Sequence, residues 1–247
     1  MSGKQVRGVM FDLGGTLCGY SMEMGAATAA GLSRLGFDPA DEKVVAAIMN
    51  AAVEASQDYA TRTSYLHRDL FRDQFARAAA LLGSEAGPEL LDWFEAENLS
   101  NIIEHLRPRP DAAELLSALR DREIYCSVVS NADDDFLGPA LARHGLDVFL
   151  SDWTSSEEAG SCKPDQAIYR RALEKSGLST DEVLFVGDSI QHDIAGASAL
   201  GMRSALISNG LGAAPFSHGL DTEVVPDFEV QELRELIGII DQLNKRP

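Results

Sequence analysis

The sequence predicts an α/β protein whose core is a doubly wound parallel sheet, with a four-helix domain inserted after the first strand. From about residue 107 onward, short β-rich runs alternate with helical segments, which is typical of βαβ units and of a parallel sheet covered on both faces. The first β-rich run is separated from the second by more than 100 residues, whereas an ordinary crossover takes a single helix. An insertion in the first crossover explains this gap.

The N-terminal part supplies the first strand and the insertion. The first strand is expected at residues 6–11, an apolar run that stops at Asp12 and is followed by Gly14 and Gly15. Ala-rich helical periodicity then predicts four helices and no strand, at residues 24–35, 41–59, 66–82 and 88–105. The predicted core domain is therefore residues 1–17 with 107–247, and the predicted helical cap domain is residues 18–106.

The C-terminal part supplies the remaining strands. A Pro-containing boundary at residues 107–110 precedes a regular alternation of strands and helices. The predicted strands are residues 124–130, 148–150, 183–186 and 204–207. The predicted helices are residues 111–121, 134–144, 166–176, 190–200 and 230–243.

Composition narrows the class of function. The chain has 247 residues and a formal net charge of −18, so its field repels polyanions and argues against nucleic acid or an anionic membrane as a partner. No stretch reaches the roughly 18 apolar residues of a membrane span, and Asp12 ends the N-terminal apolar run too early for a signal peptide. Three cysteines are too few for a disulfide framework. We therefore expect a cytoplasmic protein.

Polar residues gather where the predicted strands end. In a parallel sheet these ends share one edge, so the residues there are expected to converge; they are Asp12, Ser130 with Asn131, and Asp188, with Asp193 one helical turn later and Lys163 in a nearby loop. Two carboxylates from different strands suit Mg²⁺, which takes carboxylate and substrate phosphate oxygens. Lys163 supplies a compensating positive charge, and Asp12 is able to attack phosphorus and form an aspartyl-phosphate.

Four segments, in order, resemble the signature motifs of the haloacid dehalogenase-like (HAD) hydrolase superfamily. They are residues 11–17 (FDLGGTL), 129–131 (VSN), 163–164 (KP) and 187–193 (GDSIQHD). The resemblance covers the whole chain, and it implies a Rossmann-like core with a C1-type helical cap that sets substrate choice. It also implies residue roles: Asp12 as nucleophile, Thr16, Ser130 and Asn131 at the phosphate, Lys163 at both nucleophile and phosphate, and Asp12, Asp188 and the Gly14 carbonyl at Mg²⁺, with Asp193 behind them.

One position departs from the family pattern. The family's phosphatases carry a second Asp two residues after the nucleophile, which protonates the leaving group and later activates water, whereas this chain has Gly14. General acid–base help is worth about 10²–10⁴ in rate, or roughly 3–5 kcal/mol. A poor leaving group suffers most from its absence, and an acyl phosphate suffers less.

Three functions remain open from the sequence. The first is a Mg²⁺-dependent hydrolase of a small phosphorylated metabolite, restricted to activated substrates or using an acid from the cap or the substrate. The second is chemistry at carbon or on a phosphonate, because such branches of the family carry Tyr or Ala at the position of Gly14. The third is a HAD fold kept for binding or regulation, with little turnover. The intact pair Asp188 and Asp193 favours a metal-dependent mechanism over dehalogenation, which needs no metal.

Overall fold

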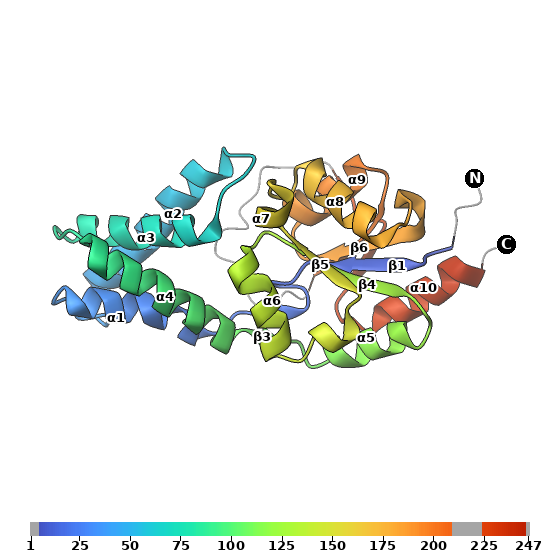
Figure 1. Ribbon diagram of the computed structural model, residues 1–247, viewed down its shortest axis with the longest axis horizontal. Helices are drawn as coiled ribbons and strands as arrows, with labels where there is room; N and C mark the ends of the chain where they lie inside the picture. Colours follow the sequence, from blue (N-terminus) through green and yellow to red (C-terminus); the bar gives the residue numbers. More distant parts are fainter. Residues whose placement is uncertain (1–4, 209–223, 246–247) are drawn as a thin grey trace. The chain divides into compact units, whose positions relative to one another are not determined.

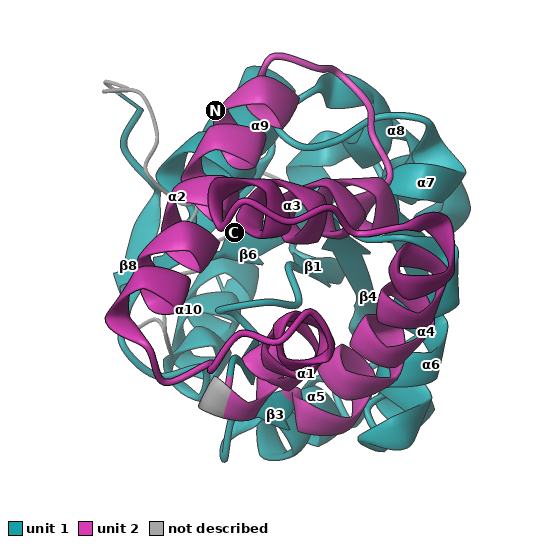
Figure 2. Ribbon diagram, turned by 90° about the vertical axis from the view of Figure 1, so that its left-hand side faces the viewer, with its two compact units in different colours: residues 1–20, 107–247 teal, residues 21–106 magenta. Residues whose placement is uncertain are grey.

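The computed structural model describes residues 5–208 and 224–245. The chain divides into two compact units, residues 1–20 with 107–247 and residues 21–106 (Figure 2). The first boundary lies three residues later than the sequence suggested. The short strands β2 (Cys18–Gly19) and β3 (Arg107–Pro108) pair antiparallel, so both connections between the units begin within the first unit.

The first unit is built on a six-stranded parallel sheet with the order β5-β4-β1-β6-β7-β8. The strands are β1 (Gly8–Phe11), β4 (Tyr125–Ser130), β5 (Asp152–Ser155), β6 (Val183–Gly187), β7 (Arg203–Ile207) and β8 (Phe228–Val230). β1 and β6 are buried along their whole length, as expected for strands in the middle of a sheet that is covered on both faces. The predicted parallel α/β core is therefore confirmed.

Helices cover both faces of this sheet. Figure 1 shows α8 (Gln166–Ser176) and α9 (Ala195–Ala199) on one face, with α5 (Ala112–Arg120) and α10 (Glu235–Lys245) on the other. Apolar side chains of α8 and α9 pack on those of β1, β4 and β6 in one buried cluster. The other helical elements of this unit are α6 (Asp134–Arg143), η2 (Asp147–Phe149), α7 (Ser156–Ala159), η3 (Thr180–Glu182) and the π-helix η4 (Ile190–Ile194).

Two predicted elements of this unit are wrong. Residues 148–150, predicted as a strand, lie in the 3₁₀-helix η2 and just after it, and the strand is instead β5, four residues later. The sequence of β5 is polar because it is an edge strand with one neighbour, and its Trp153 is 37 % exposed. The helix predicted from residue 230 begins at Glu235, because Val230 ends the edge strand β8. The other predicted elements agree with the structure to within about two residues.

In the part that the structure describes, the second unit consists of helices and contains no strand. Its elements are η1 (Met22–Gly25), α1 (Ala26–Arg34), α2 (Glu42–Ala60), α3 (His67–Leu81) and α4 (Pro88–His105). Phe75 of α3 and Phe94 of α4 stack with their ring centroids 4.3 Å apart in its core. Arg72 pairs with Asp92 at 2.8 Å, so this arginine of α3 ties together two helices of the unit.

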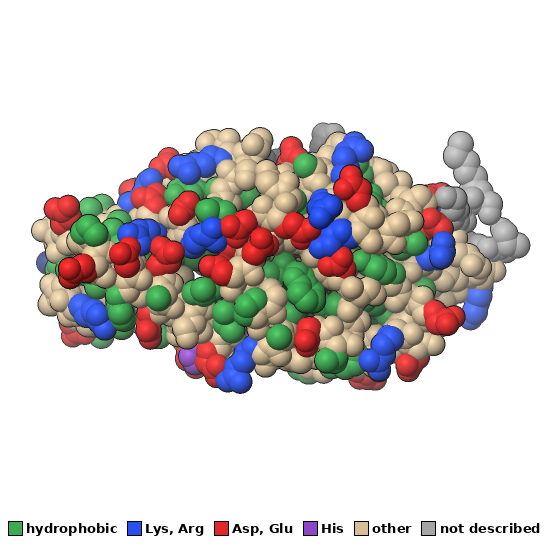
Figure 3. Space-filling view, viewed as in Figure 1, with side chains coloured by type: hydrophobic (Ala, Val, Ile, Leu, Met, Phe, Trp, Pro, Cys, Tyr) green, Lys and Arg blue, Asp and Glu red, His purple; other side chains and the backbone are tan. Residues whose placement is uncertain are grey.

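Charged side chains are distributed over the surface. Figure 3 shows acidic and basic side chains interspersed on the face that it presents, in keeping with exposed pairs such as Arg171 with Glu158. Among the helices of the described residues, none combines the length and the apolar character that crossing a membrane requires.

Candidate active site

Three of the predicted site residues lie at the carboxyl ends of adjacent strands. Asp12 follows β1, Ser130 is the last residue of β4, and Asp188 follows β6. Since β1 lies between β4 and β6 in the sheet, the three residues share one short stretch of its edge. In open α/β sheets this edge is where ligands bind.

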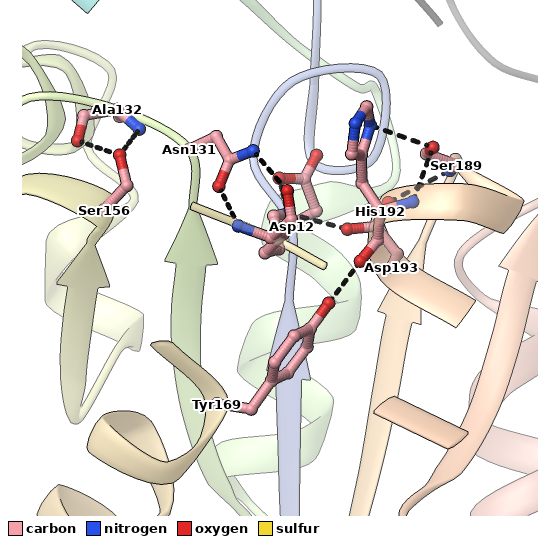
Figure 4. A network of polar contacts seen from close by, with 9 residues as sticks. Asp12, Asn131, Ala132, Ser156, Tyr169, Ser189, His192 and Asp193 are labelled. Atoms are coloured by element: carbon pink, nitrogen blue, oxygen red, sulfur yellow. Dashed lines mark hydrogen bonds and ion pairs between the residues drawn. The ribbon is translucent and has the colours of Figure 1, made fainter. Parts of the chain in front are cut away.

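Lys163, in the loop before α8, joins two predicted carboxylates. Its Nζ lies 2.5 Å from Oδ1 of Asp12 and 2.7 Å from Oδ1 of Asp193, and all three residues are buried. Figure 4 shows Asp12 and Asp193 near one another in this network of polar contacts. Burial by itself would lower the pKa of Lys163, but the charges of Asp12 and Asp193 outweigh it and raise this pKa. Lys163 is therefore a fixed positive charge beside Asp12.

Asp12, Asp188 and Asp193 form a cluster of carboxylates. One oxygen from each lies within 4.8 Å of the oxygens of the other two. Burial raises the pKa of Asp12 to about 6, against the lowering effect of Lys163. Burial also raises the pKa of Asp188 to about 7, and the charges of Asp12 and Asp193 add to this rise. The cluster thus carries more negative charge than Lys163 neutralises.

This set of donors fits a hard divalent cation. Mg²⁺ prefers carboxylate oxygens, and a divalent cation would offset the repulsion that helps to raise the pKa of Asp188. Asp193 already engages both of its oxygens, since Oδ1 accepts from Lys163 and Oδ2 accepts from the Ser189 N–H at 3.0 Å. Asp12 and Asp188 are therefore the better-placed ligands, and Asp193 is placed to hold Lys163.

The loop after Asp12 is packed directly against Asp188. Gly15 has a φ of +83°, and a Cβ at this position would lie 2.1 Å from Oδ2 of Asp188. The loop is closed by its own backbone, because the Gly15 N–H donates to the Cys18 carbonyl at 2.6 Å. Glycine is required here both by the backbone conformation and by the closeness of the carboxylate.

The three residues expected beside Lys163 at the phosphate have different surroundings. Ser130 is buried at the same edge as Asp12. The side chain of Asn131 contacts the backbone of Lys163: its Oδ1 accepts from the Lys163 N–H at 2.6 Å, and its Nδ2 donates to the Lys163 carbonyl at 3.2 Å. Thr16 is fully buried, and its Oγ1 has no hydrogen-bond partner among residues 5–208 and 224–245.

The turn that carries Asp193 is the π-helix η4, which follows β6 almost directly. The Ser189 hydroxyl accepts from the His192 N–H at 3.1 Å, and the hydroxyl of Tyr169 donates to the His192 carbonyl (Figure 4). Single π-turns occur frequently at functional sites. This one brings Asp193 back over the Ser189 N–H and toward Lys163.

Sequence reasoning did not identify two tyrosines at this site. Tyr169 comes from α8 and is fully buried beneath η4. Tyr20 comes from the segment after β2, and its hydroxyl would lie 1.9 Å from a Cβ placed on Gly14. Glycine at a position where the family pattern has an acidic residue suggests that space for a side chain is limited there. The sequence does not show which residue occupies that space.

A family model described as a haloacid dehalogenase-like hydrolase matches residues 6–201. Among curated relatives, the ribulose-1,5-bisphosphate 5-phosphatase of Halopiger xanaduensis is 29 % identical over 94 % of this chain and 98 % of its own length. The phosphoglycolate phosphatase of Neisseria meningitidis serogroup A is 27 % identical over 94 % of this chain and 93 % of its own.

Solved structures show the same fold. The L-2-haloacid dehalogenase from Xanthobacter autotrophicus has a TM-score of 0.71 at 22 % identity, covering 96 % of this chain and 99 % of that one. YfnB from Bacillus subtilis, described as a HAD-hydrolase and bound to magnesium, has a TM-score of 0.74 at 21 % identity, covering 96 % and 100 %. At these identities the likeness shows the fold alone.

Proposed function

The chain belongs to the haloacid dehalogenase-like hydrolase family and to its phosphatase class, and from this premise we propose that it is a Mg²⁺-dependent phosphatase of a small metabolite, with Asp12 as the nucleophile. The observation that carries the proposal is the buried contact of Asp12 with Lys163, beside Asp188 at one edge of the sheet. It brings together a nucleophile, a fixed positive charge and donors for a cation.

In the first step, a carboxylate oxygen of Asp12 attacks the phosphorus of the substrate. A new O–P bond forms, the bond from phosphorus to the leaving-group oxygen breaks, and that oxygen keeps the electron pair. Lys163 lies 2.5 Å from Oδ1 of Asp12, so its charge orients the nucleophile and offsets the negative charge of the transferring group.

In the second step, water attacks the phosphorus of the aspartyl-phosphate. The O–P bond to Asp12 breaks, the carboxylate is regenerated, and inorganic phosphate leaves. The hydroxyl of Ser130 and the backbone N–H of Asn131, at the end of β4, are the proposed donors to the phosphoryl oxygens.

The residues that would hold Mg²⁺ are Asp12, Asp188 and the backbone carbonyl of Gly14, with Asp193 behind them. When bound, Mg²⁺ supplies positive charge that neutralises the phosphoryl oxygens. The net charge of −18 makes such local positive charge necessary before an anionic substrate is attracted.

The substrate class follows from Gly14, which has no side chain to protonate a leaving group. Phosphates whose leaving group departs as a weak base, such as acyl phosphates, are the substrates that this site suits. We assign the choice among them to the helical unit at residues 21–106, acting as a cap.

The test is phosphate release from acetyl phosphate and p-nitrophenyl phosphate, with Mg²⁺ or with a chelator. We expect Mg²⁺-dependent release that falls by roughly 10³-fold or more in Asp12→Asn, while Asp241→Asn, a change in an exposed ion pair with Arg122, retains it. In ¹⁸O-water the label should enter phosphate. Wild-type protein that releases no phosphate, undiminished release by Asp12→Asn, or label in the Asp12 carboxylate would each overturn the proposal.

A further inference from the structure

The space above Gly14 is already filled by the side chain of Tyr20. A Cβ on Gly14 would lie 1.9 Å from Oη and 2.8 Å from Cζ of Tyr20, and both distances are shorter than the 3.0 Å below which real Cβ contacts essentially never occur. Gly14 is not among the glycines with positive φ, so its backbone conformation does not call for glycine. A side chain at position 14 would have to displace Tyr20, whose hydroxyl lies in the direction that this side chain would take.

The Tyr20 hydroxyl lies in the field of the carboxylate cluster. Burial of the hydroxyl end raises the pKa of Tyr20, and the negative charges of Asp12 and Asp188 raise it further. The residue as a whole is 44 % exposed, while its hydroxyl lies against Gly14. A phenol with an ordinary pKa near 10 is already neutral at pH 7, so this hydroxyl offers a hydrogen as well as lone pairs.

Among the residues that the structure describes, the Tyr20 hydroxyl makes no hydrogen bond to another residue. A hydrogen-bond donor that is shielded from water destabilises the fold unless a ligand or a water molecule accepts from it. The Tyr20 hydroxyl lies against Gly14, two residues after the proposed nucleophile, and has no acceptor among the described residues, so it is available to a substrate.

We propose that Tyr20 is a catalytic residue whose phenol O–H donates a hydrogen bond to the leaving-group oxygen of the substrate, from the place where a side chain at position 14 would stand. The inference rests on the proposed function, because it assigns a donor to the same reaction. The phenol keeps its proton. The bond from phosphorus to the leaving-group oxygen breaks with both electrons on that oxygen, which is hydrogen-bonded to Tyr20 as it departs. A basic phenolate then takes a proton from water, whereas the carboxylate of an acyl phosphate leaves as the anion.

This role restricts the substrate. A hydrogen bond lowers the energy of a departing oxyanion, but it does not replace full proton transfer to a strongly basic alkoxide. Tyr20 therefore suits acyl and aryl phosphates, and alkyl phosphates should be hydrolysed slowly.

The first test compares Tyr20→Phe with wild type on a series of aryl phosphates whose leaving groups differ in pKa. The value of kcat/KM reports the steps up to departure of the leaving group, so it is the quantity to measure. We expect kcat/KM to fall by about 10- to 10²-fold, most for the most basic leaving group, so that the dependence of log kcat/KM on leaving-group pKa becomes steeper. The control is Tyr125→Phe, which removes a hydroxyl at the end of β4 opposite Ser130. This variant should keep the wild-type kcat/KM and its wild-type dependence on leaving-group pKa.

Phenylalanine keeps the volume of the ring, so a purely structural role predicts no change in this dependence. Tyr20→Phe with wild-type kcat/KM across the series would overturn the inference while leaving the proposed function intact. A wild-type protein without Asp12-dependent phosphate release would instead overturn the proposed function. The two failures are therefore distinguishable.

The second test uses the overlap between the Tyr20 hydroxyl and a side chain placed at position 14. Gly14→Asp alone should lower the melting temperature, because its Cβ would collide with Tyr20. Gly14→Asp combined with Tyr20→Ala should recover much of that loss and gain activity on an alkyl phosphate such as glycerol 3-phosphate. If Gly14→Asp alone is as stable as wild type, or if Tyr20→Ala gives no recovery, the two side chains do not compete for one position and the inference is wrong.

Discussion

The side-chain amide of Asn131 holds the backbone of Lys163 at both of its polar groups, accepting from the N–H at 2.6 Å and donating to the carbonyl at 3.2 Å. The two residues are 32 positions apart in the sequence, and Asn131 directly follows β4. Since the Lys163 ammonium reaches Asp12 and Asp193 from this anchored peptide, Asn131 sets the position of a charge that it does not itself touch.

This relationship predicts that Asn131→Ala acts through Lys163. We expect it to weaken the Mg²⁺-dependent binding of inorganic phosphate about 10-fold, because a loosened ammonium is no longer held at the phosphate position. In a Lys163→Met background the same change should have less than about a twofold effect, because interacting residues are not additive. Isothermal titration of the four proteins measures the coupling, and equal effects in both backgrounds would show that Asn131 acts independently.

The carboxylate cluster predicts how stability depends on pH. The pKa values of Asp12 and Asp188 are raised by folding, to about 6 and about 7, so the folded protein favours their protonated forms. Their stabilising contribution is complete below about pH 4 and is lost as the pH rises through 6 and 7. The protein without metal should therefore lose stability over this range, and Mg²⁺ should stabilise it most above pH 7.

Asp188→Asn tests this directly, because it removes one like charge from the cluster. In a chelator at pH 8 the variant should melt at a higher temperature than wild type, by about 2–4 °C for each kcal/mol of repulsion removed. The difference should shrink toward pH 4.5. Mg²⁺ should raise the melting temperature of wild type and not that of the variant. A variant that is less stable than wild type at pH 8 without metal would mean that repulsion at Asp188 is not a significant cost.

The residues at the strand ends could be predicted from the sequence, because the carboxyl ends of parallel strands share one edge of the sheet. Once the alternation predicts a parallel sheet, Asp12 and Asp188 must reach a common edge, and the structure has them there. Edge strands do not follow the same pattern. β5 is polar and β8 is only three residues long, so neither carried the apolar run that identifies a central strand.

Side-chain contacts that depend on the path of a loop could not be predicted from the sequence. The sequence did not predict that the side-chain amide of Asn131 binds the Lys163 backbone, a contact that depends on how the loop before α8 folds back. Tyr20 lies six residues after Gly14, and no periodicity relates the two. Their contact arises from the closed turn after Asp12 and from the ribbon of β2 with β3.

The hydroxyl of Tyr169 is predicted to stabilise the turn that carries Asp193 at the proposed metal site. It donates to the His192 carbonyl within the π-helix that carries Asp193, and the residue is fully buried. Tyr169→Phe leaves that carbonyl without this donor, which should cost about 1–3 kcal/mol of unfolding free energy. It should also weaken Mg²⁺ binding severalfold, as measured by titration. Loss of stability with unchanged Mg²⁺ affinity would limit Tyr169 to packing.

Gly15 and Gly36 allow two effects of an alanine substitution to be separated. One is backbone strain at positive φ, and the other is a collision with the Asp188 carboxylate. Gly15 and Gly36 both have positive φ, +83° and +89°, but a Cβ on Gly15 would meet Asp188 at 2.1 Å, whereas a Cβ on Gly36 has nothing within 4 Å. Alanine at either position should cost about 1–2 kcal/mol from the left-handed backbone. Melting curves in a chelator should show a loss for both variants, and a larger one for Gly15→Ala.

Only Gly15→Ala should change the response to metal. Its methyl group displaces either the loop after Asp12 or the Asp188 carboxylate, so the rise in melting temperature on adding Mg²⁺ should vanish and phosphate release should fall by at least about 10²-fold. Gly36→Ala, in the helical unit, should keep the Mg²⁺ response of wild type. If Gly15→Ala keeps its Mg²⁺ response and its phosphate release, the close approach of the loop to Asp188 is not needed for the site, and Asp188 would lose its place among the proposed ligands.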